Sequence, residues 1–465
     1  MSAPTRRGFM QMVAAGSTAA MLGVRTLAAP AKQRPNIAFI FTDDQRYDTI
    51  HALGNEHITT PNLDALVRHG VTFTHACIMG GNSGAVCIPS RAMLHSGRTL
   101  FRAPHDLAGV TLFPEWLREH GYVTFGTGKW HNGPVSYARA FSDGATIFFG
   151  GMSDHSRVQV ADFDPTGKYP KERRYVGGEF SGELFTDSAI EFLRRHDGRK
   201  PFLLYLAHAE PHDPRMAPEP YASMYDPERM PLPPNFLPEH PFDNGELKVR
   251  DEQLAPWPRT PEVVREHIAA YYAMITHMDA QVGRLLDALR ETGHAEDTII
   301  IFAGDNGLAV GQHGLLGKQS VYEHSVRVPL IISGPGIPSG KRRDAFCYLL
   351  DLFPTLCELT GVPVPEGVEG QSLVPVLTGR RRRLRDNLFF AYRHFQRSVR
   401  ERRYKLIEYF VNEARHTQLF DLATDRWETT NLAADASYAG HLERLRAELA
   451  RWQDEVDDPL AGAAL

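Results

Sequence analysis

Short runs of apolar residues alternate along this chain with segments in which apolar residues recur at helical spacing. Short apolar runs bounded by turn residues are typical of buried strands, and their alternation with helices is typical of an α/β fold. We therefore predict a large mixed, mostly parallel sheet flanked by helices. The predicted strands cover residues 36–41, 71–76, 122–127, 202–207, 298–303 and 328–333. Helices are predicted after Thr60, after Phe113 and from about Glu262 to Leu289.

The pattern changes near residue 380, where an arginine-rich stretch precedes two short strand-like segments and a closing helical segment. This order predicts a small C-terminal α+β domain over 380–465, after a larger domain over 32–379. The run Arg380–Arg383 could bind an anion, but a solvated loop at the domain junction is the favoured interpretation. Residues 130–180 and 208–260 read as long loops, which usually shape a binding site.

Composition and charge narrow the possible partners. The chain has 465 residues, of which 42% are hydrophobic and 23% charged, so it is long and apolar enough for a folded protein of one large domain or two unequal ones. Its formal net charge of −5, from 51 basic and 56 acidic side chains, gives no general reason to expect nucleic acid or an acidic membrane as a partner.

The N-terminal segment, residues 1–31, has the features of a twin-arginine export signal. Arg6 and Arg7 are followed by Phe9, a short apolar run rich in Ala and Gly, and the small residues 29–31 of a cleavage site. Arg25 ends the apolar run, which is too short for a membrane-spanning helix. We therefore expect a periplasmic or secreted protein without a membrane span.

The four cysteines do not form the dense pattern of a disulfide-stapled scaffold. Cys347 and Cys357 fall in a predicted helix over 346–361, where the helical rise would separate them by roughly 15 Å, too far for a disulfide. These two cysteines and Cys77 are interpreted as core residues.

Polar residues collect where the predicted strands end. In open α/β sheets, the crevice beyond the carboxyl ends of the strands is where ligands bind. Three carboxylates and an amide there offer the hard oxygen ligands that Ca²⁺ or Mg²⁺ prefers. These four candidate metal ligands are Asp43, Asp44, Asp305 and Asn306.

Cationic and proton-donating side chains reach the same edge of the predicted sheet. They would bind an oxyanion and stabilise charge that develops on it. These residues are Arg91, Lys129, His131, His208, His212 and Lys318.

Cys87 stands at a predicted helix start, two residues before Pro89. A thiol at a helix N-terminus has a lowered pKa and would be reactive, whereas the alternative interpretation is an inert buried cysteine.

These segments resemble the sulfatase family, which belongs to the alkaline-phosphatase-like superfamily. Cys87-Ile-Pro-Ser-Arg91 matches the family signature C-x-P-S-R, and the further matches occur in family order from about residue 35 to the C-terminal domain. They are the acidic pair after the first strand, GYVTFGTGKWHNG, HAEPHDP, FAGDNG and GKQSVYEHSVRVP.

The resemblance implies a role for each matching residue. Cys87 would be oxidised to formylglycine by a formylglycine-generating enzyme and would join Asp43, Asp44, Asp305 and Asn306 as a ligand to Ca²⁺, with Mg²⁺ as the alternative. The hydrated aldehyde would attack sulfur. Arg91 would hold the formylglycine in place. Sulfate would be bound by Lys129, His131, His212 and Lys318. His212 or Lys318 would then protonate the leaving alcohol, and His131 would help to expel sulfate.

The spacing of HAEPHDP leaves open whether His208 or His212 contacts sulfate, and we prefer His212 for its Pro-His-x-Pro context. His313 in GQHGLLGK is a further candidate for substrate binding.

The resemblance therefore implies hydrolysis of a sulfate monoester. We favour a sulfated saccharide of the kind that bacterial glycan sulfatases use, for example a uronate 2-O-sulfate of a glycosaminoglycan fragment. The reason is that arginines near the opening of the predicted site could bind the uronate carboxylate through two hydrogen bonds. Two alternatives stay open: a phosphomonoester, phosphodiester or phosphonate hydrolase on the same fold, and a catalytically silent glycan-binding protein. The pair Asp305-Asn306 argues against the first, since two-metal hydrolases of this superfamily generally have Asp-His there.

Overall fold

The computed structural model describes residues 34–462, so the predicted export signal lies outside the described residues. Within this range a nine-stranded sheet forms the centre of the fold. Its strands, in spatial order, are β10 (Arg327–Val328), β2 (Gly70–Cys77), β11 (Leu330–Ser333), β9 (Thr298–Gly304), β1 (Asn36–Thr42), β8 (Phe202–Ala207), β4 (Val123–Lys129) and β5 (Asp143–Phe148), with β12 (Lys341–Tyr348) paired to β2.

The sheet is mixed and mostly parallel, as predicted. Strands β9, β1, β8, β4 and β5 run parallel, and so do β2 and β12, whereas β11 is antiparallel to both β9 and β2. The predicted strand 328–333 is divided into β10 and β11 at Pro329, which has no N–H to donate to a strand ladder.

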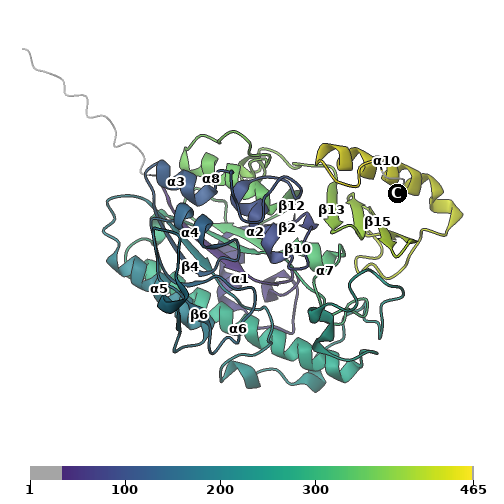
Figure 1. Ribbon diagram of the computed structural model, residues 1–465, viewed down its shortest axis with the longest axis horizontal. Helices are drawn as coiled ribbons and strands as arrows, with labels where there is room; N and C mark the ends of the chain where they lie inside the picture. The colour runs from purple at the N-terminus through teal and green to yellow at the C-terminus, as the bar shows by residue number, and fades with distance from the viewer. Residues whose placement is uncertain (1–33, 463–465) are drawn as a thin grey trace, which may run out of the picture. The chain divides into compact units, whose positions relative to one another are not determined.

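Helices cover both faces of the sheet because the side chains of each strand alternate between two apolar clusters. On β1, Ile37, Phe39 and Phe41 pack in the cluster that includes residues of α2, α3 and α8, while Ala38 and Ile40 pack in the cluster that includes residues of α1, α5 and α6. Figure 1 shows these two groups of helices on opposite sides of the sheet. The helices are α1 (Pro61–His69), α2 (Cys87–Ser96), α3 (Phe113–Glu119), α4 (Pro134–Ala140), α5 (Ser181–Arg195), α6 (Pro261–Glu291), α7 (Glu323–Val326), α8 (Leu352–Thr360), α9 (Val374–Leu377) and α10 (Ala439–Glu455).

A second sheet, closed by α10, follows near the C-terminus, where the sequence predicts a small α+β region. Its order is β16 (Ala414–Asp421), β15 (Tyr404–Val411), β14 (Gln396–Arg400), β13 (Leu388–Tyr392) and β3 (Gly80–Gly81). The first four strands pair antiparallel, and β3 pairs parallel to β13. Because β3 comes from the N-terminal half of the chain, residues 380–465 do not build this sheet alone. A two-stranded ribbon of β6 (Gln159–Val160) and β7 (Tyr175–Val176) lies in one of the predicted long loops.

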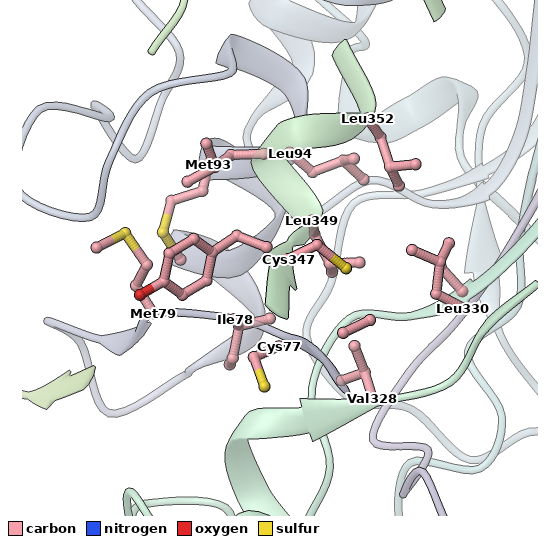
Figure 2. Packing of buried hydrophobic residues seen from close by; sticks show 14 of the residues in the cluster. Cys77, Ile78, Met79, Met93, Leu94, Val328, Leu330, Cys347, Leu349 and Leu352 are labelled. Atoms are coloured by element: carbon pink, nitrogen blue, oxygen red, sulfur yellow. The ribbon is translucent and has the colours of Figure 1, made fainter. Parts of the chain in front are cut away.

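The predicted helix over 346–361 is wrong in its first part. Cys347 lies in β12, paired beside β2, and only Cys357 lies in a helix, α8. Both cysteines and Cys77 are nevertheless buried and free, as their interpretation as core residues requires. Figure 2 shows Cys77 and Cys347 among the apolar side chains of this cluster.

The described chain contains no helix long and apolar enough to cross a membrane.

Gly128 pairs with Ala207 of β8, one residue before Lys129. Its φ is +86°, and a Cβ atom there would lie 1.9 Å from the carbonyl oxygen of Ala207. The register of β4 also shifts between Thr127 and Gly128. Glycine therefore permits the local backbone at the end of β4, where Lys129 lies.

We predict that Gly128→Ala lowers the free energy of unfolding by more than the left-handed conformation alone accounts for. Gly121 is the matched control, because its φ is +95° and a Cβ atom there would meet no atom of a non-adjacent residue within 4 Å. Gly121→Ala should cost about 1–2 kcal/mol, and the clash at Gly128 should add about 1–3 kcal/mol. Denaturant unfolding of the two variants measures the difference, and equal losses would contradict the prediction.

Candidate active site

The predicted acidic residues meet at the carboxyl ends of the two central strands β1 and β9. Asp43 and Asp44 follow β1, Asp305 and Asn306 follow β9, and all four side chains are buried. The backbone N–H of Asp44 donates to Asp305 Oδ1 at 3.0 Å, and Asn306 Nδ2 donates to Asp44 Oδ1 at 2.7 Å. The register between β1 and β9 thus brings together side chains that are more than 260 positions apart in sequence.

Two oxygens of this cluster are suited to a cation. Asp43 Oδ1 and Asn306 Oδ1 are buried without a hydrogen-bond partner. Buried polar atoms are rarely left unpaired, because the lost hydration costs free energy. One ligand atom each of Asp43, Asp44 and His212 also lie within 4.8 Å of one another. A set dominated by carboxylate and amide oxygens fits Ca²⁺ or Mg²⁺ better than a softer metal.

Three cationic side chains offset the three carboxylates. Lys129 Nζ contacts Asp43 Oδ2, Lys318 Nζ lies 2.7 Å from Asp44 Oδ1, and Arg91 Nε lies 3.0 Å from Asp305 Oδ2. Burial alone would raise the pKa of the Asp43 carboxyl, but Lys129 and the neighbouring cations hold that pKa well below its usual range. Burial, reinforced by the charge of Asp43, raises the pKa of Asp305 to about 7 despite Arg91.

Cys87 is the first residue of α2 and faces this cluster. Its Sγ lies 3.1 Å from His131 Nδ1 and 3.8 Å from Lys129 Nζ, and the residue is 1% exposed. The expectation of a lowered pKa is wrong: burial raises the pKa of this thiol, and Lys129 and Lys318 offset the effect only in part.

His131 and His212 flank the cluster. Burial, together with Lys129, lowers the pKa of His131 to about 2, so its ring is neutral at physiological pH. His212 Nδ1 lies 2.8 Å from the backbone oxygen of Asp213, which can only accept, so Nδ1 carries the proton. Nε2 of the same ring then points toward Asp44 Oδ2 at 3.6 Å. Since both atoms carry lone pairs when His212 is neutral, a proton or a cation between them would be stabilising.

His208 lies outside this group. Its backbone N–H donates to Phe41, its side chain is fully buried, and neither ring nitrogen has a hydrogen-bond partner among the described residues. Burial lowers the pKa of His208 to about 4. Of the two histidines in HAEPHDP, the structure therefore places His212, and not His208, against the acidic residues.

His313 is held by a different set of neighbours. Its ring stacks on Tyr322 with 3.9 Å between the ring centroids, and its Nε2 donates to the backbone oxygen of Glu428 at 2.9 Å. No contact within residues 34–462 joins its side chain to the acidic residues, and its role in substrate binding stays a prediction.

The sequence did not single out an ionic group beside His212. Arg250 binds the carboxylate of Asp213 at 2.8 Å and that of Asp251 at 2.5 Å, and its side chain is 44% exposed. Asp251 in turn accepts from Gln319 Nε2 at 2.8 Å. Arg250, Asp213 and Asp251 lie in the predicted long loop 208–260, and Gln319 follows Lys318 directly. The length of the loop indicated that this segment shapes a binding site, but no periodic pattern identified the individual residues.

A second ionic pair that the sequence did not predict joins α6 to the loop that carries His212. His277 Nδ1 of α6 lies 2.8 Å from Glu210 Oε1, and both side chains are fully buried. The backbone N–H of Asp43 also donates to the Glu210 carbonyl at 3.0 Å. This pair therefore connects α6 with the backbone at both Asp43 and His212.

The sulfatase family model matches residues 35–362, and the model described as N-sulphoglucosamine sulphohydrolase, C-terminal, matches residues 311–455. This chain belongs to the sulfatase family. The sulfatase is 26% identical to the N-acetylglucosamine-6-O-sulfatase of Bacteroides thetaiotaomicron, over 94% of this chain and 90% of that protein. It is 29% identical to an arylsulfatase of Clostridium perfringens, over 89% of this chain and 93% of the relative.

Among solved structures, a protein in complex with its substrate D-glucosamine-2-N,6-O-disulfate superposes with a TM-score of 0.79 and 24% identity, covering 93% of this chain and all of that one. This similarity confirms the fold. Family membership and the named relatives show the catalytic activity: the protein is a sulfuric ester hydrolase.

The different positions of the two histidines generate a prediction. Loss of a side chain that transfers a proton or binds developing charge typically lowers kcat by about 10²–10⁴-fold. His212→Ala should show such a loss, whereas His208→Gln should lose far less. Steady-state kinetics on one sulfate ester compare the variants, and thermal unfolding checks that each is folded. A folded His208→Gln that loses as much kcat as His212→Ala would contradict the assignment.

Proposed function

We propose that this sulfatase removes an O-sulfate group from a sugar, with residue 87 as formylglycine and one divalent cation bound among Asp43, Asp44, Asp305 and Asn306. The observation that carries the proposal is the position of Cys87. Its sulfur lies beside His131 and Lys129, at the edge of a buried carboxylate cluster with two unpaired oxygens. A structural core cysteine has no need of such neighbours.

The raised pKa of the Cys87 thiol supports conversion of this residue rather than direct use of its sulfur. A thiol that stays protonated is a poor nucleophile. Oxidised to formylglycine by a maturation enzyme, residue 87 would supply an oxygen nucleophile, and the cation would polarise the sulfate ester. Arg91, one helical turn further on and fully buried against Asp305, would hold α2 in the orientation that presents residue 87.

The surrounding cations suit a sulfate monoester, which carries one negative charge. Lys129 contacts Asp43 and Lys318 contacts Asp44, so both ammonium groups lie at the acidic pair, where they can bind sulfate oxygens. Nearby carboxylates, Asp44 above all, outweigh burial and raise the pKa of Lys318 well above its usual value, so this residue is suited to holding charge. Burial and Lys318 lower the pKa of His212, so once its Nε2 has taken up a proton, the imidazolium is a stronger acid than Lys318 and the better proton donor to the leaving alcohol. His131, neutral at physiological pH, can accept the proton of the hydroxyl at residue 87 when sulfate is expelled.

One observation of the structure favours a saccharide over a small aryl sulfate, whereas the relatives include both an N-acetylglucosamine-6-O-sulfatase and an arylsulfatase. Arg250, Asp251 and Asp213 place charged groups beside His212, where they can bind polar substituents of a sugar ring. A uronate 2-O-sulfate of a glycosaminoglycan fragment remains our first candidate.

Export through the twin-arginine pathway to the periplasm completes the proposal and rests on Arg6 and Arg7. Normal periplasmic accumulation of an Arg6→Lys, Arg7→Lys variant would contradict it.

Sulfated saccharides should be hydrolysed with a higher kcat/KM than a small aryl sulfate. Contacts to the sugar away from the reacting sulfur supply binding energy that is used in the transition state. A panel of defined sulfated mono- and disaccharides, compared with 4-nitrophenyl sulfate under identical conditions, measures the ratio. A clearly higher kcat/KM on the aryl sulfate would contradict the saccharide assignment.

Calcium should stabilise the folded protein through the acidic cluster. At a free concentration of about 100 times Kd, a ligand specific to the folded state adds about 2.7 kcal/mol to the free energy of unfolding. Thermal unfolding with Ca²⁺ and with chelator measures this effect, which Asp43→Asn should largely remove. The matched control is Asp154→Asn, since Asp154 is an exposed acid. An equal Ca²⁺-dependent shift in the wild type and Asp43→Asn would contradict the site.

A further inference from the structure

Side chains from three segments that are distant in sequence meet at one place on the surface. Arg381, Arg382 and Arg383 follow α9, Asp344 lies in β12, and Arg402 lies in the turn between β14 and β15. These five residues line a cavity of about 420 Å³. We refer to it as the arginine groove. Four of its five lining residues carry a positive charge, although the chain as a whole carries a net charge of −5.

The positive charge of the arginine groove is only partly neutralised. Arg402 pairs with Asp344 at 2.7 Å and lies over the ring of Phe346, which holds its guanidinium in place. Arg383 approaches Asp386 only to 3.7 Å. Within residues 34–462, neither Arg381 nor Arg382 forms an ion pair, and both are exposed. The groove therefore has unpaired guanidinium groups next to one that is already oriented.

The structure changes the interpretation of the run Arg380–Arg383. The sequence favoured a solvated loop because the chain as a whole carries a negative charge. Folding adds Arg402 from the second sheet and limits the acidic residues in the groove to Asp344. Side chains of like charge gathered from separate segments repel one another, and a bound anion would relieve this repulsion.

We propose that the arginine groove binds sulfate or carboxylate groups of a polyanionic glycan, as a second site outside the catalytic cluster. This inference rests on the proposed saccharide substrate. Guanidinium groups are planar and weakly hydrated, and they bind such anions through two parallel hydrogen bonds. The volume of the groove lies within the range of ordinary ligand sites. A glycan bound here and at the catalytic site would be retained while one sulfate is removed.

The lining of the groove favours a glycan over other polyanions. No aromatic side chain lines it, whereas proteins that bind single-stranded nucleic acids usually stack bases on aromatic rings. It has no apolar lining residue that could enter a membrane.

A binding experiment tests the groove independently of catalysis. Full-length protein carrying Cys87→Ala is titrated with heparin, a highly sulfated glycosaminoglycan, by calorimetry at several salt concentrations. The test variant adds Arg381→Ala, Arg382→Ala and Arg383→Ala. The control adds Arg194→Ala, Arg199→Ala and Lys200→Ala, which remove the same charge from exposed positions at the end of α5 and in the loop after it.

The groove variant should bind heparin at least about tenfold more weakly, with a smaller dependence of affinity on salt, because fewer anionic groups are neutralised. The control should retain most of the affinity. Asp344→Asn, which removes the one acidic residue of the groove, should bind more tightly than the parent. Equal losses in the groove variant and the control, or unchanged binding in both, would overturn the proposal.

Two further measurements separate the possible causes. Duplex DNA and vesicles of anionic lipid are titrated in parallel, and binding of either as tight as that of heparin would overturn the assignment to a glycan. In protein with Cys87 intact, the groove variant should lose kcat/KM on a sulfated polysaccharide and keep it on a sulfated monosaccharide. If neither saccharide is hydrolysed by the parent while the heparin results hold, the proposed substrate fails and the groove stands.

Discussion

The proposed active site depends on the burial of three carboxylates at the ends of two adjacent strands. Asp43, Asp44 and Asp305 lie together because β1 and β9 pair in register up to Thr42 and Gly304. Buried like charges repel strongly in a medium of low dielectric constant. The fold therefore has to bring cations to this point, and each comes from a different element: Lys129 from β4, Arg91 from α2 and Lys318 from the loop before α7.

The requirement for Arg91 explains where Cys87 lies. These residues are four positions apart on α2, so they share one face of the helix. Arg91 donates to Asp305 and to the backbone oxygen of Lys129, and the hydroxyl of Ser90 donates to the backbone oxygen of Asp305. These contacts hold the start of α2 against the acidic cluster. Cys87 is thereby held beside His131 and Lys129, where the proposed mechanism requires a nucleophile.

The strand-end residues were predictable from sequence because parallel strands end at one edge of a sheet. The choice between His208 and His212 was less certain, since both follow β8 and only the path of the loop turns His212 toward Asp44. Local pattern misled at Cys347, where a continuous apolar run reads equally well as strand or helix. Arg250 with Asp213, and Arg402 beside Arg381, were beyond sequence reasoning because these groups meet only through loops without periodicity.

The central claim is that residue 87 acts as formylglycine at the edge of the acidic cluster. Mass spectrometry of the peptide containing residue 87, measured on preparations matured to different extents and compared with their sulfatase activity, tests it most directly. We predict that activity rises in proportion to the formylglycine fraction and falls to background when that fraction is zero. Full activity in protein whose Cys87 is entirely an unmodified thiol would contradict this mechanism.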